Sequence, residues 1–77
     1  MYKELIEYLV KSLVHNKDSV VITEAEDNGK TIITVKVEST DMGRVIGKDG
    51  RIIKSIREIV RAYSAKNGAK VVVNIEE

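Results

Sequence analysis

The sequence predicts an α+β fold in which a three-stranded mixed sheet carries three helices packed on one face. Three observations predict this class. Apolar residues recur at helical spacing near the N-terminus and again after residue 50, the segment 19–38 has the composition of a β-hairpin, and a short β-branched run lies near the end of the chain. The element order is therefore αββααβ. A chain of 77 residues indicates a single domain, residues 1–77.

The first helix is predicted at residues 2–14. Its apolar side chains recur at steps of three and four, which places them on one face: Leu5, Ile6, Leu9, Val10 and Leu13. Residues 16–18 break this pattern. We expect His15, the only histidine, to lie at the end of the helix, where a positive charge suits the helix dipole.

The segments "SVVITEAE" and "KTIITVKVE" are rich in β-branched residues and are predicted to pair as a hairpin over residues 19–38. Asn28-Gly29 lies between them and favours a type I′ turn, because that turn needs positive φ at both central positions. In the second strand, Ile33, Val35 and Val37 alternate with polar residues, so we expect these three side chains to face the core.

A short helix is predicted at 40–46. Ser39 or Thr40 can cap it, and Asp41 suits its first turn because a negative charge is favourable there. Gly47 is expected to end this helix in the left-handed conformation.

A longer helix is predicted from Arg51 to about Lys66, ended by Asn67-Gly68. We expect its buried face to contain Ile52, Ile53, Ile56, Ile59, Val60 and Tyr63. The final strand, residues 70–75, follows. The two helices make a crossover long enough for this strand to pair in parallel with the second strand of the hairpin.

The composition excludes several classes of function. The chain has no cysteine and one histidine, so the sequence predicts no disulfide, no metal site, no cofactor and no catalytic residues. Lys3, Glu4 and Glu7 interrupt the apolar run at the N-terminus, which argues against a secretory signal and a membrane span. We therefore expect a cytoplasmic protein without a membrane partner.

The net charge of +1 is unevenly distributed. Residues 1–42 carry five Lys/Arg and eight Asp/Glu, net −3, whereas residues 43–61 carry six and two, net +4. The remaining residues, 62–77, carry two of each. The positive pole is thus the segment that contains the glycines of "GKDG", which indicates an anionic partner there.

The loop Gly47-Lys48-Asp49-Gly50 lies between two predicted helices. Its glycines permit a tight turn and a close backbone approach, and the next helix begins with free N–H groups that favour an anion. Lys48 and Arg51 add positive charge, so the loop suits a phosphodiester. A tight helix-to-helix connection alone also explains the glycines. A basic stripe of Arg51, Lys54, Arg57 and Arg61 along the following helix favours nucleic acid over that simpler interpretation.

The stretch "VIGKDGRII" resembles the V-I-G-x-x-G-x-x-I hallmark of KH domains, in which the G-x-x-G loop clamps four backbone nucleotides. The element order is similar to that of a type II KH domain. The small size, "ELIEYLVKSLV", "DMGRVIGKDGRIIKSIR" and "KVVVNIEE" together resemble the bacterial KhpA family of stand-alone KH domains.

This resemblance implies cytoplasmic binding of single-stranded RNA and a role as an RNA chaperone or post-transcriptional regulator. It also implies a complex with a KhpB-type KH protein, a homodimer, and an influence on cell length and peptidoglycan homeostasis.

The predicted RNA groove lies between the short helix, the start of the long helix and an edge of the sheet. Backbone N–H groups of the loop would hold phosphates, basic side chains would extend the track, and part of Val45 or Ile46 would support bases. Asp49 should weaken binding without abolishing it. The RNA-binding residues predicted from the sequence are Arg44, Val45, Ile46, Gly47, Lys48, Asp49, Gly50, Arg51, Lys54 and Arg57.

Three alternatives stay open at this point. The helix faces could form a protein-interaction module that dimerises or binds the KhpB-type partner, with incidental nucleic-acid binding. Single-stranded DNA could replace RNA, because only contacts to the 2′-OH separate the two. An enzyme would need a nucleophile with a base or paired carboxylates, and no such set is evident. The three tyrosines all lie in predicted helices, which argues against base stacking on a sheet.

Overall fold

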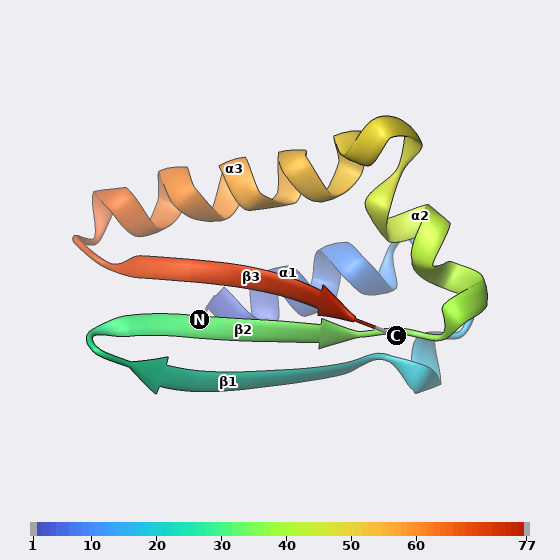
Figure 1. Cartoon of the computed structure of the whole chain (residues 1–77), viewed down its shortest axis with the longest axis horizontal. Helices are drawn as coiled ribbons and strands as arrows, with labels where there is room; N and C mark the ends of the chain where they lie inside the picture. The colour runs from blue at the N-terminus through green and yellow to red at the C-terminus, as the bar shows by residue number, and fades with distance from the viewer. Residues whose placement is uncertain (1, 77) are drawn as a thin grey trace.

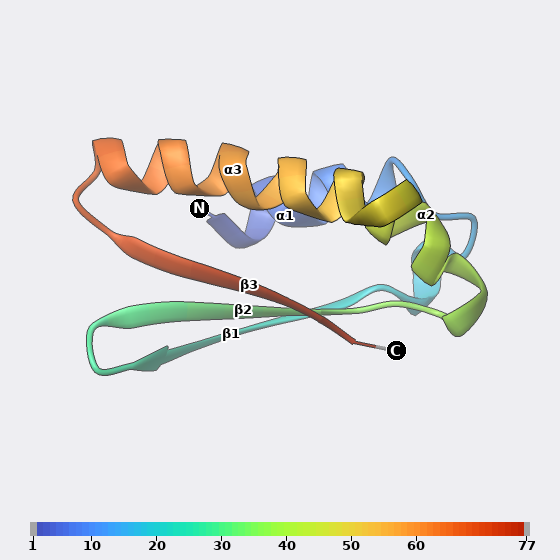
Figure 2. The same ribbon diagram turned by 45° about the horizontal axis from the view of Figure 1, so that its top comes forward.

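The structure is a computed structural model that describes residues 2–76. Two helices cover one face of a three-stranded sheet, and a third helix lies at one end of it (Figures 1 and 2). The elements along the chain are α1 (Tyr2–Lys11), β1 (Val21–Asp27), β2 (Lys30–Lys36), α2 (Met42–Ile46), α3 (Arg51–Lys66) and β3 (Lys70–Glu76). Short 3₁₀ turns occupy Lys17–Ser19, Ser39–Asp41 and Lys48–Gly50. The predicted αββααβ order is confirmed.

The sheet has the strand order β1-β2-β3, with β1 antiparallel and β3 parallel to the central strand. Ile33 is paired with Glu24 on one side and Val73 on the other. The hairpin turn has positive φ at both Asn28 (52°) and Gly29 (81°), as the type I′ prediction requires. The mixed sheet predicted from the sequence is therefore confirmed, and β3 is one of its two edge strands.

One core fills the space between the sheet and the helices. Its members come from the inward faces of the strands, from the three helices and from the chain just beyond α1 and β2: Ile6, Val10, Val14, Ile22, Ile33, Val35, Val37, Val45, Ile53, Ile56, Val60 and Val73. The prediction that Ile33, Val35 and Val37 face the core is confirmed. Because burying such a side chain contributes roughly 1.5–3 kcal/mol, this set is the main source of stability in so small a chain.

The buried face of α3 is narrower than predicted. Ile53, Ile56 and Val60 are buried as expected, but Ile59 is 48% exposed and Tyr63 is 39% exposed. The buried stripe continues instead at Ser64, whose hydroxyl donates to the Arg61 carbonyl oxygen. A sheet of three strands offers the helix only a narrow contact, so residues at the flank of the stripe stay at the surface. There the Tyr63 ring meets the Tyr2 ring edge to face, with centroids 5.6 Å apart.

The first helix ends earlier than predicted, at Lys11 rather than residue 14. Val14 is still buried, because the N–H groups of Leu13 and Val14 both donate to the Val10 carbonyl oxygen and turn the chain inward. The expectation for His15 is wrong: it lies in the loop beyond the helix with an exposed side chain, and it does not stand at the helix end.

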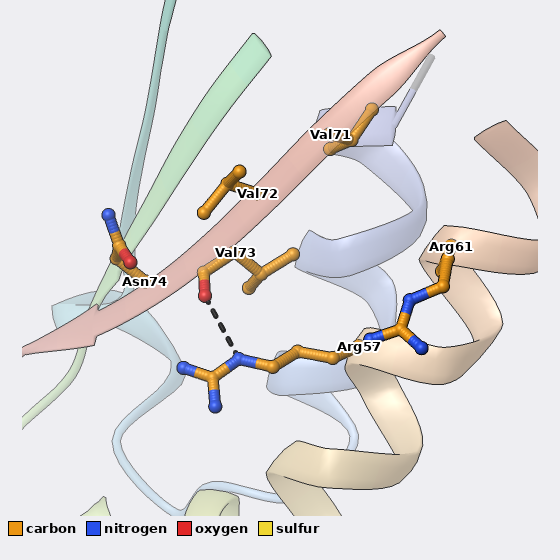
Figure 3. A pocket seen from close by; sticks show the side chains of 6 residues that line it. All are labelled: Arg57, Arg61, Val71, Val72, Val73 and Asn74. Atoms are coloured by element: carbon orange, nitrogen blue, oxygen red, sulfur yellow. Dashed lines mark hydrogen bonds between the residues drawn. The ribbon is translucent and has the colours of Figure 1, made fainter. Parts of the chain in front are cut away.

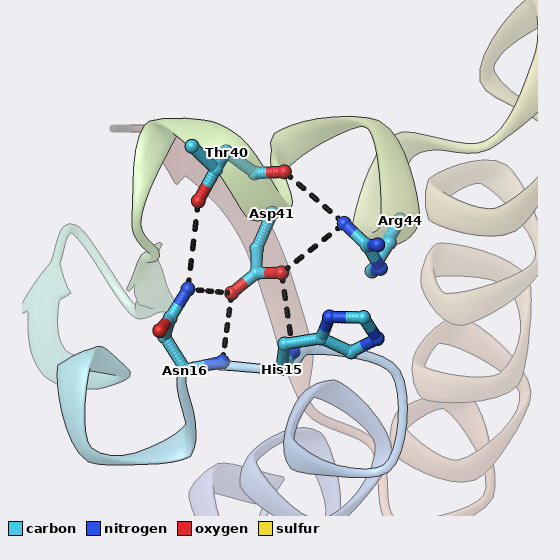
Figure 4. Close-up of polar contacts among 5 residues, drawn as sticks. All are labelled: His15, Asn16, Thr40, Asp41 and Arg44. Carbon is cyan, nitrogen blue, oxygen red and sulfur yellow. Dashed lines mark hydrogen bonds and ion pairs between the residues drawn. The ribbon is translucent and has the colours of Figure 1, made fainter.

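Asp41 has a different role from the predicted one. Its side chain makes no capping bond, and neither Ser39 nor Thr40 caps α2. Instead the fully buried Asp41 carboxylate accepts bonds from the backbone N–H groups of His15 (3.1 Å) and Asn16 (3.0 Å) and from the Asn16 amide (3.0 Å). Arg44 Nη1 lies 3.5 Å from the same carboxylate (Figure 4). The loop after α1 is thereby tied to the start of α2.

These contacts lower the pKa of Asp41 from its ordinary value of 3.8. The Asn16 N–H has the largest effect, and together with His15, the Asn16 amide and Arg44 it outweighs the opposing effect of burial. A carboxyl whose pKa is lower in the folded state stabilises the fold above its unfolded pKa. That stabilisation is lost as the pH falls through the folded-state pKa.

We therefore predict that Asp41→Asn lowers the melting temperature at pH 7 by several degrees, because the amide has one acceptor where the carboxylate has two. The difference from the unmodified chain should shrink as the pH falls below about 4, where the Asp41 carboxyl begins to be protonated in the unfolded chain, and should vanish below the lower pKa of the folded chain. Melting curves followed by circular dichroism between pH 3 and 7 measure this. Asp18→Asn, at an exposed aspartate, is the matched control and should change little. A difference that stays constant down to pH 3 would contradict the role of the carboxylate charge.

Candidate nucleic-acid interface

The loop between α2 and α3 turns through three residues with positive φ. Gly47 has φ 79° and ψ 172°, Asp49 has φ 56° and ψ 26°, and Gly50 has φ 74° and ψ 15°. Gly47 ends α2 as predicted, but it does so with an extended ψ and not in the left-handed helical conformation expected from the sequence. That region of backbone space is essentially restricted to glycine.

Gly47 is also required by packing. A Cβ atom at this position would lie 2.5 Å from Ile52 Cγ1, which is far inside normal contact distance. Gly50 differs, because within the described residues no heavy atom of the rest of the fold lies within 4 Å of the position of its Cβ. The space beside Gly50 is therefore open, as a backbone approaching from another molecule requires.

The conformation of Asp49 gives a reason for an acid in this basic loop. Asp49 takes the left-handed conformation, which costs most residues roughly 1–2 kcal/mol but which aspartate and asparagine visit more readily. The side chain is exposed. Its shape therefore suits the turn even though its charge opposes an anion.

Only some backbone N–H groups of the loop are available for an anion. The N–H of Gly50 donates to the Gly47 carbonyl oxygen at 3.1 Å, and the N–H of Arg51 donates to that of Lys48. Among residues 2–76 no hydrogen bond uses the N–H of Lys48 or Asp49. Of the N–H groups from Lys48 to Arg51 that were predicted to hold phosphates, only those of Lys48 and Asp49 are therefore available.

The predicted basic side chains differ in how firmly they are held. Lys48, Arg51 and Lys54 are exposed, and within the described part of the chain their charged groups make no hydrogen bond or ion pair. Arg44 is restrained, since its Nη1 donates to the Thr40 carbonyl oxygen at 3.2 Å and lies beside Asp41. Arg57 is restrained as well, and its partner is on β3.

A pocket of about 250 Å³ separates α3 from the edge of the sheet (Figure 3). Arg57 and Arg61 line it from the helix, and residues 71–74 line it from β3. Arg57 spans this pocket, because its Nε donates to the Val73 carbonyl oxygen at 3.1 Å. The structure therefore places a hollow at the edge of the sheet, but farther along α3 than the predicted groove beside α2.

One of the two apolar residues predicted to support bases is not available. Val45 has no exposed surface, because it packs into the core beneath α2, and Ile53 is only 7% exposed, as predicted for the buried face of α3. The prediction that Val45 could support a base is therefore wrong. Ile46 is partly exposed and is the one residue of the predicted pair that a base could contact.

The sequence-based prediction missed the β3 residues of the pocket, and it left Arg61 in the basic stripe without placing it at the site. The sequence feature that could have located these residues is the parallel pairing of the last strand, because a strand that follows the crossover and pairs on one side only leaves its other edge unpaired and facing α3.

Within residues 2–76, no cluster of three or more metal-ligating side chains is found. Within the same residues no helix is long and apolar enough to cross a membrane.

The chain matches a known protein family along most of its length. The family model described as the KhpA/KhpB KH domain matches residues 3–75. This chain belongs to the KhpA/KhpB family. Its KH domain includes the "VIGKDGRII" stretch, and the assignment made from the sequence is confirmed.

Curated KhpA/KhpB relatives match along nearly the whole chain. The RNA-binding protein KhpA of Clostridium perfringens is 47% identical over 73 residues, which cover 95% of this chain and 97% of the relative. The RNA-binding protein KhpA of Aquifex aeolicus is 41% identical over 75 residues, which cover 97% and 95%. The RNA-binding protein KhpA of Listeria monocytogenes is 45% identical over 75 residues.

Solved structures with a similar fold come from the protein Era. A crystal structure of Aquifex aeolicus Era bound to GDP·AlF4⁻ superposes with a TM-score of 0.62 at 16% identity, over 96% of this chain and 29% of Era. A structure of Era in complex with MgGDPNP and nucleotides 1506–1542 of 16S ribosomal RNA gives the same TM-score. At this identity the likeness shows the fold alone, and the chain spans less than a third of Era.

Substitution of the two loop glycines by alanine should reduce stability to different extents. Gly47→Ala should lower stability by more than 2 kcal/mol or about 10 °C, because it adds a clash with Ile52 to an unfavourable φ. Gly50→Ala should cost only about 1–2 kcal/mol, because the space beside it is open. Gly43→Ala, inside α2, should stabilise by about 0.5–1 kcal/mol and serves as the control. Thermal melts of the three variants test this order, and equal effects at Gly47 and Gly50 would contradict the packing argument.

Proposed function

We propose that this chain binds single-stranded RNA, with the phosphodiester backbone at the Gly47–Gly50 loop and the bases directed along α3 towards β3. The observation that supports this most is the loop itself. It combines open space beside Gly50, two unused N–H groups and the free charges of Lys48 and Arg51 at one end of α3. The family relatives that match nearly the whole chain are named RNA-binding proteins.

The proposed binding depends on the positive charge at the loop and on the open space beside Gly50. A phosphate beside the loop would accept hydrogen bonds from the N–H groups of Lys48 and Asp49, while the side chains of Lys48 and Arg51 supply charge-assisted contacts. The sugar-phosphate chain would pass beside Gly50, where a Cβ would obstruct it. Lys54 and Arg57 would continue the track along the helix. Arg44, held by Thr40 and Asp41, would flank the loop from α2.

We expect binding to be weak and tolerant of sequence at most positions. Base stacking on aromatic side chains contributes roughly 1–3 kcal/mol per base in other single-strand binders. Here Tyr2 and Tyr8 lie in α1, and Tyr63 lies in the C-terminal half of α3, away from the loop. Binding therefore depends on phosphate contacts, which makes it sensitive to salt.

The finer roles implied by the resemblance to KhpA remain part of this proposal. They are action as an RNA chaperone or post-transcriptional regulator in the cytoplasm, a complex with a KhpB-type protein, and an influence on cell length and peptidoglycan homeostasis. The proposal also includes self-association, for which the exposed apolar side chains of Tyr8 on α1 and Ile59 on α3 are candidate contacts. Sedimentation at low and high salt distinguishes self-association from RNA binding, because an apolar dimer responds little to salt whereas RNA binding weakens steeply as salt rises.

Lys48→Asp tests the loop directly. We predict a loss of affinity for a short single-stranded RNA of at least tenfold at low salt, because the change removes a phosphate contact and adds a repulsive charge. The unmodified chain should show a log–log salt slope of about −2 to −3, as expected for three or four phosphates. Fluorescence anisotropy over a salt series measures both quantities.

Lys70→Asp provides the matched control, because it makes the same charge change at an exposed lysine at the start of β3, beside the far end of α3. It should leave the affinity within about threefold. Thermal melts of both variants exclude unfolding as the cause. If Lys48→Asp binds RNA as tightly as the control, the loop is not the phosphate site. A single-stranded DNA of the same sequence, measured in parallel, tests the preference for RNA.

Asp49→Asn should have the opposite effect. Asparagine also accepts the left-handed conformation, so the turn is kept while a negative charge beside the phosphate is removed. We predict affinity for RNA to rise about threefold to fivefold at low salt, from a repulsion of about 1 kcal/mol at contact distance in water. The same anisotropy assay measures it. Unchanged affinity would place the phosphate away from Asp49.

A further inference from the structure

We propose that the free edge of β1 binds an extended basic segment of another protein, which joins the sheet as a fourth strand beside β1. The segment carries Lys or Arg at two positions, two residues apart, opposite Glu24 and Glu26. This site lies on the other edge of the sheet from β3. The inference therefore goes beyond the proposed RNA binding and does not depend on it.

The two edges of the sheet differ in how far they are covered. The strand order β1-β2-β3 leaves β1 and β3 with one paired side each. The β3 edge is partly closed, because α3 packs along it and the Val73 carbonyl oxygen accepts from Arg57. Among the described residues, no α-helix and no other strand lies alongside the outer side of β1 (Figures 1 and 2). An added strand therefore meets less obstruction at β1.

The hairpin determines which backbone groups of β1 face this open edge. Because the turn between β1 and β2 has two residues, Asp27 and Lys30 form the hydrogen-bonded pair that closes it. Hydrogen-bonded and non-hydrogen-bonded pairs alternate from there, so Glu26, Glu24 and Ile22 form non-hydrogen-bonded pairs with β2. The N–H and C=O groups of these three residues point away from β2. They are unused donors and acceptors for an added strand.

β1 lacks most of the features that block strand addition. It pairs with β2 without a bulge over Val21–Asp27 and contains neither proline nor lysine. The charged side chains of the strand are Glu24, Glu26 and Asp27, which are all acidic and exposed. Among residues 2–76 the carboxylates of Glu24 and Glu26 make no hydrogen bond or ion pair. The charge at this edge therefore favours a positively charged strand.

The alternation of side chains sets the pattern of the partner. Ile22, Glu24 and Glu26 lie on the face of the strand that the helices cover, where Ile22 is buried and the two glutamates are exposed. A Lys or Arg directly opposite each glutamate forms a cross-strand ion pair, which also fixes the register. Thr23 and Ala25 are exposed on the other face and suit a β-branched residue between the two cations.

A second copy of this chain fits the edge less well than a basic segment. An antiparallel pairing of two β1 strands centred on Glu24 sets the two Glu24 side chains opposite each other. A pairing centred on Ala25 sets Glu24 of one copy opposite Glu26 of the other. Like charges directly opposite each other are destabilising. The acidic side chains therefore disfavour self-pairing and favour a partner of opposite charge.

The test uses the full chain labelled with ¹⁵N and a blocked short peptide in which two lysines alternate with threonine and valine. We expect the amide signals of residues 21–27 to shift and to saturate as the peptide is added. Two matched peptides serve as controls. One has glutamate in place of both lysines, and the other has N-methyl groups on the backbone side that faces β1. Each should bind about tenfold more weakly or less, because the first is repelled and the second lacks the donors.

Glu24→Pro tests the edge from the protein side. Proline is tolerated in an edge strand where its nitrogen faces solvent, so this change removes an outward N–H and keeps the pairing with β2. We predict about tenfold weaker binding of the lysine peptide. Glu24→Gln with Glu26→Gln keeps the backbone and should weaken binding about threefold or more. Glu38→Gln with Glu58→Gln removes two exposed charges elsewhere and should change it less than about twofold. Melting curves show whether each variant is folded.

Three results would overturn the inference. If the lysine peptide at millimolar concentration shifts no signal of β1, the glutamates only protect the edge from pairing. If the N-methylated peptide binds as tightly as its parent, charges attract it and no strand is added. If the β1 signals shift with protein concentration alone, a second copy occupies the edge. RNA binding is measured separately by anisotropy, and its absence would overturn the proposed function while leaving this inference in place.

Discussion

The buried carboxylate of Asp41 is the constraint on which the placement of the loop depends. The chain between α1 and β1 has little core of its own, and α2 is only five residues long. Asp41 joins these two short segments by accepting from the backbone of His15 and Asn16 on one side while Arg44 meets it on the other. Among residues 2–76 no buried side-chain polar atom lacks a partner, so this contact is fully satisfied.

The basic side chains of α3 differ along its length. The N-terminal end of the helix carries exposed cations that have no partner among residues 2–76, beside a loop with open space, and both features suit a charged backbone of any sequence. The middle of the helix carries Arg57, which is tethered to the edge of the sheet. The cations near the loop are therefore held less firmly than the one that bridges to β3. Ile59 and Tyr63, farther along the helix, are partly exposed apolar side chains.

Much of the fold could be predicted from the sequence because its signals are local. The Asn28-Gly29 turn, the alternation in β2 and the glycine that ends α2 each depend on neighbours within a few positions. Asp41 could not be placed, because its partners lie 25 and 26 residues away and an aspartate near a helix start has an obvious local role. The link from Arg57 to Val73 could not be predicted either, because it depends on the distance between α3 and β3. Ile59 was misplaced because periodicity gives the direction of a helix face but not its width.

The parallel pairing of β2 with β3 has a consequence for how the molecule assembles. Ile33 is paired with Val73, forty positions further along the chain, so these strands can meet only after a long loop has closed. Such distant pairings form late and slowly compared with a hairpin or a helix. We expect the hairpin and α3 to form early and β3 to dock last, so the pocket between α3 and β3 exists only once folding is complete. A nascent chain would thus present the basic face of α3 before the pocket beside it has formed.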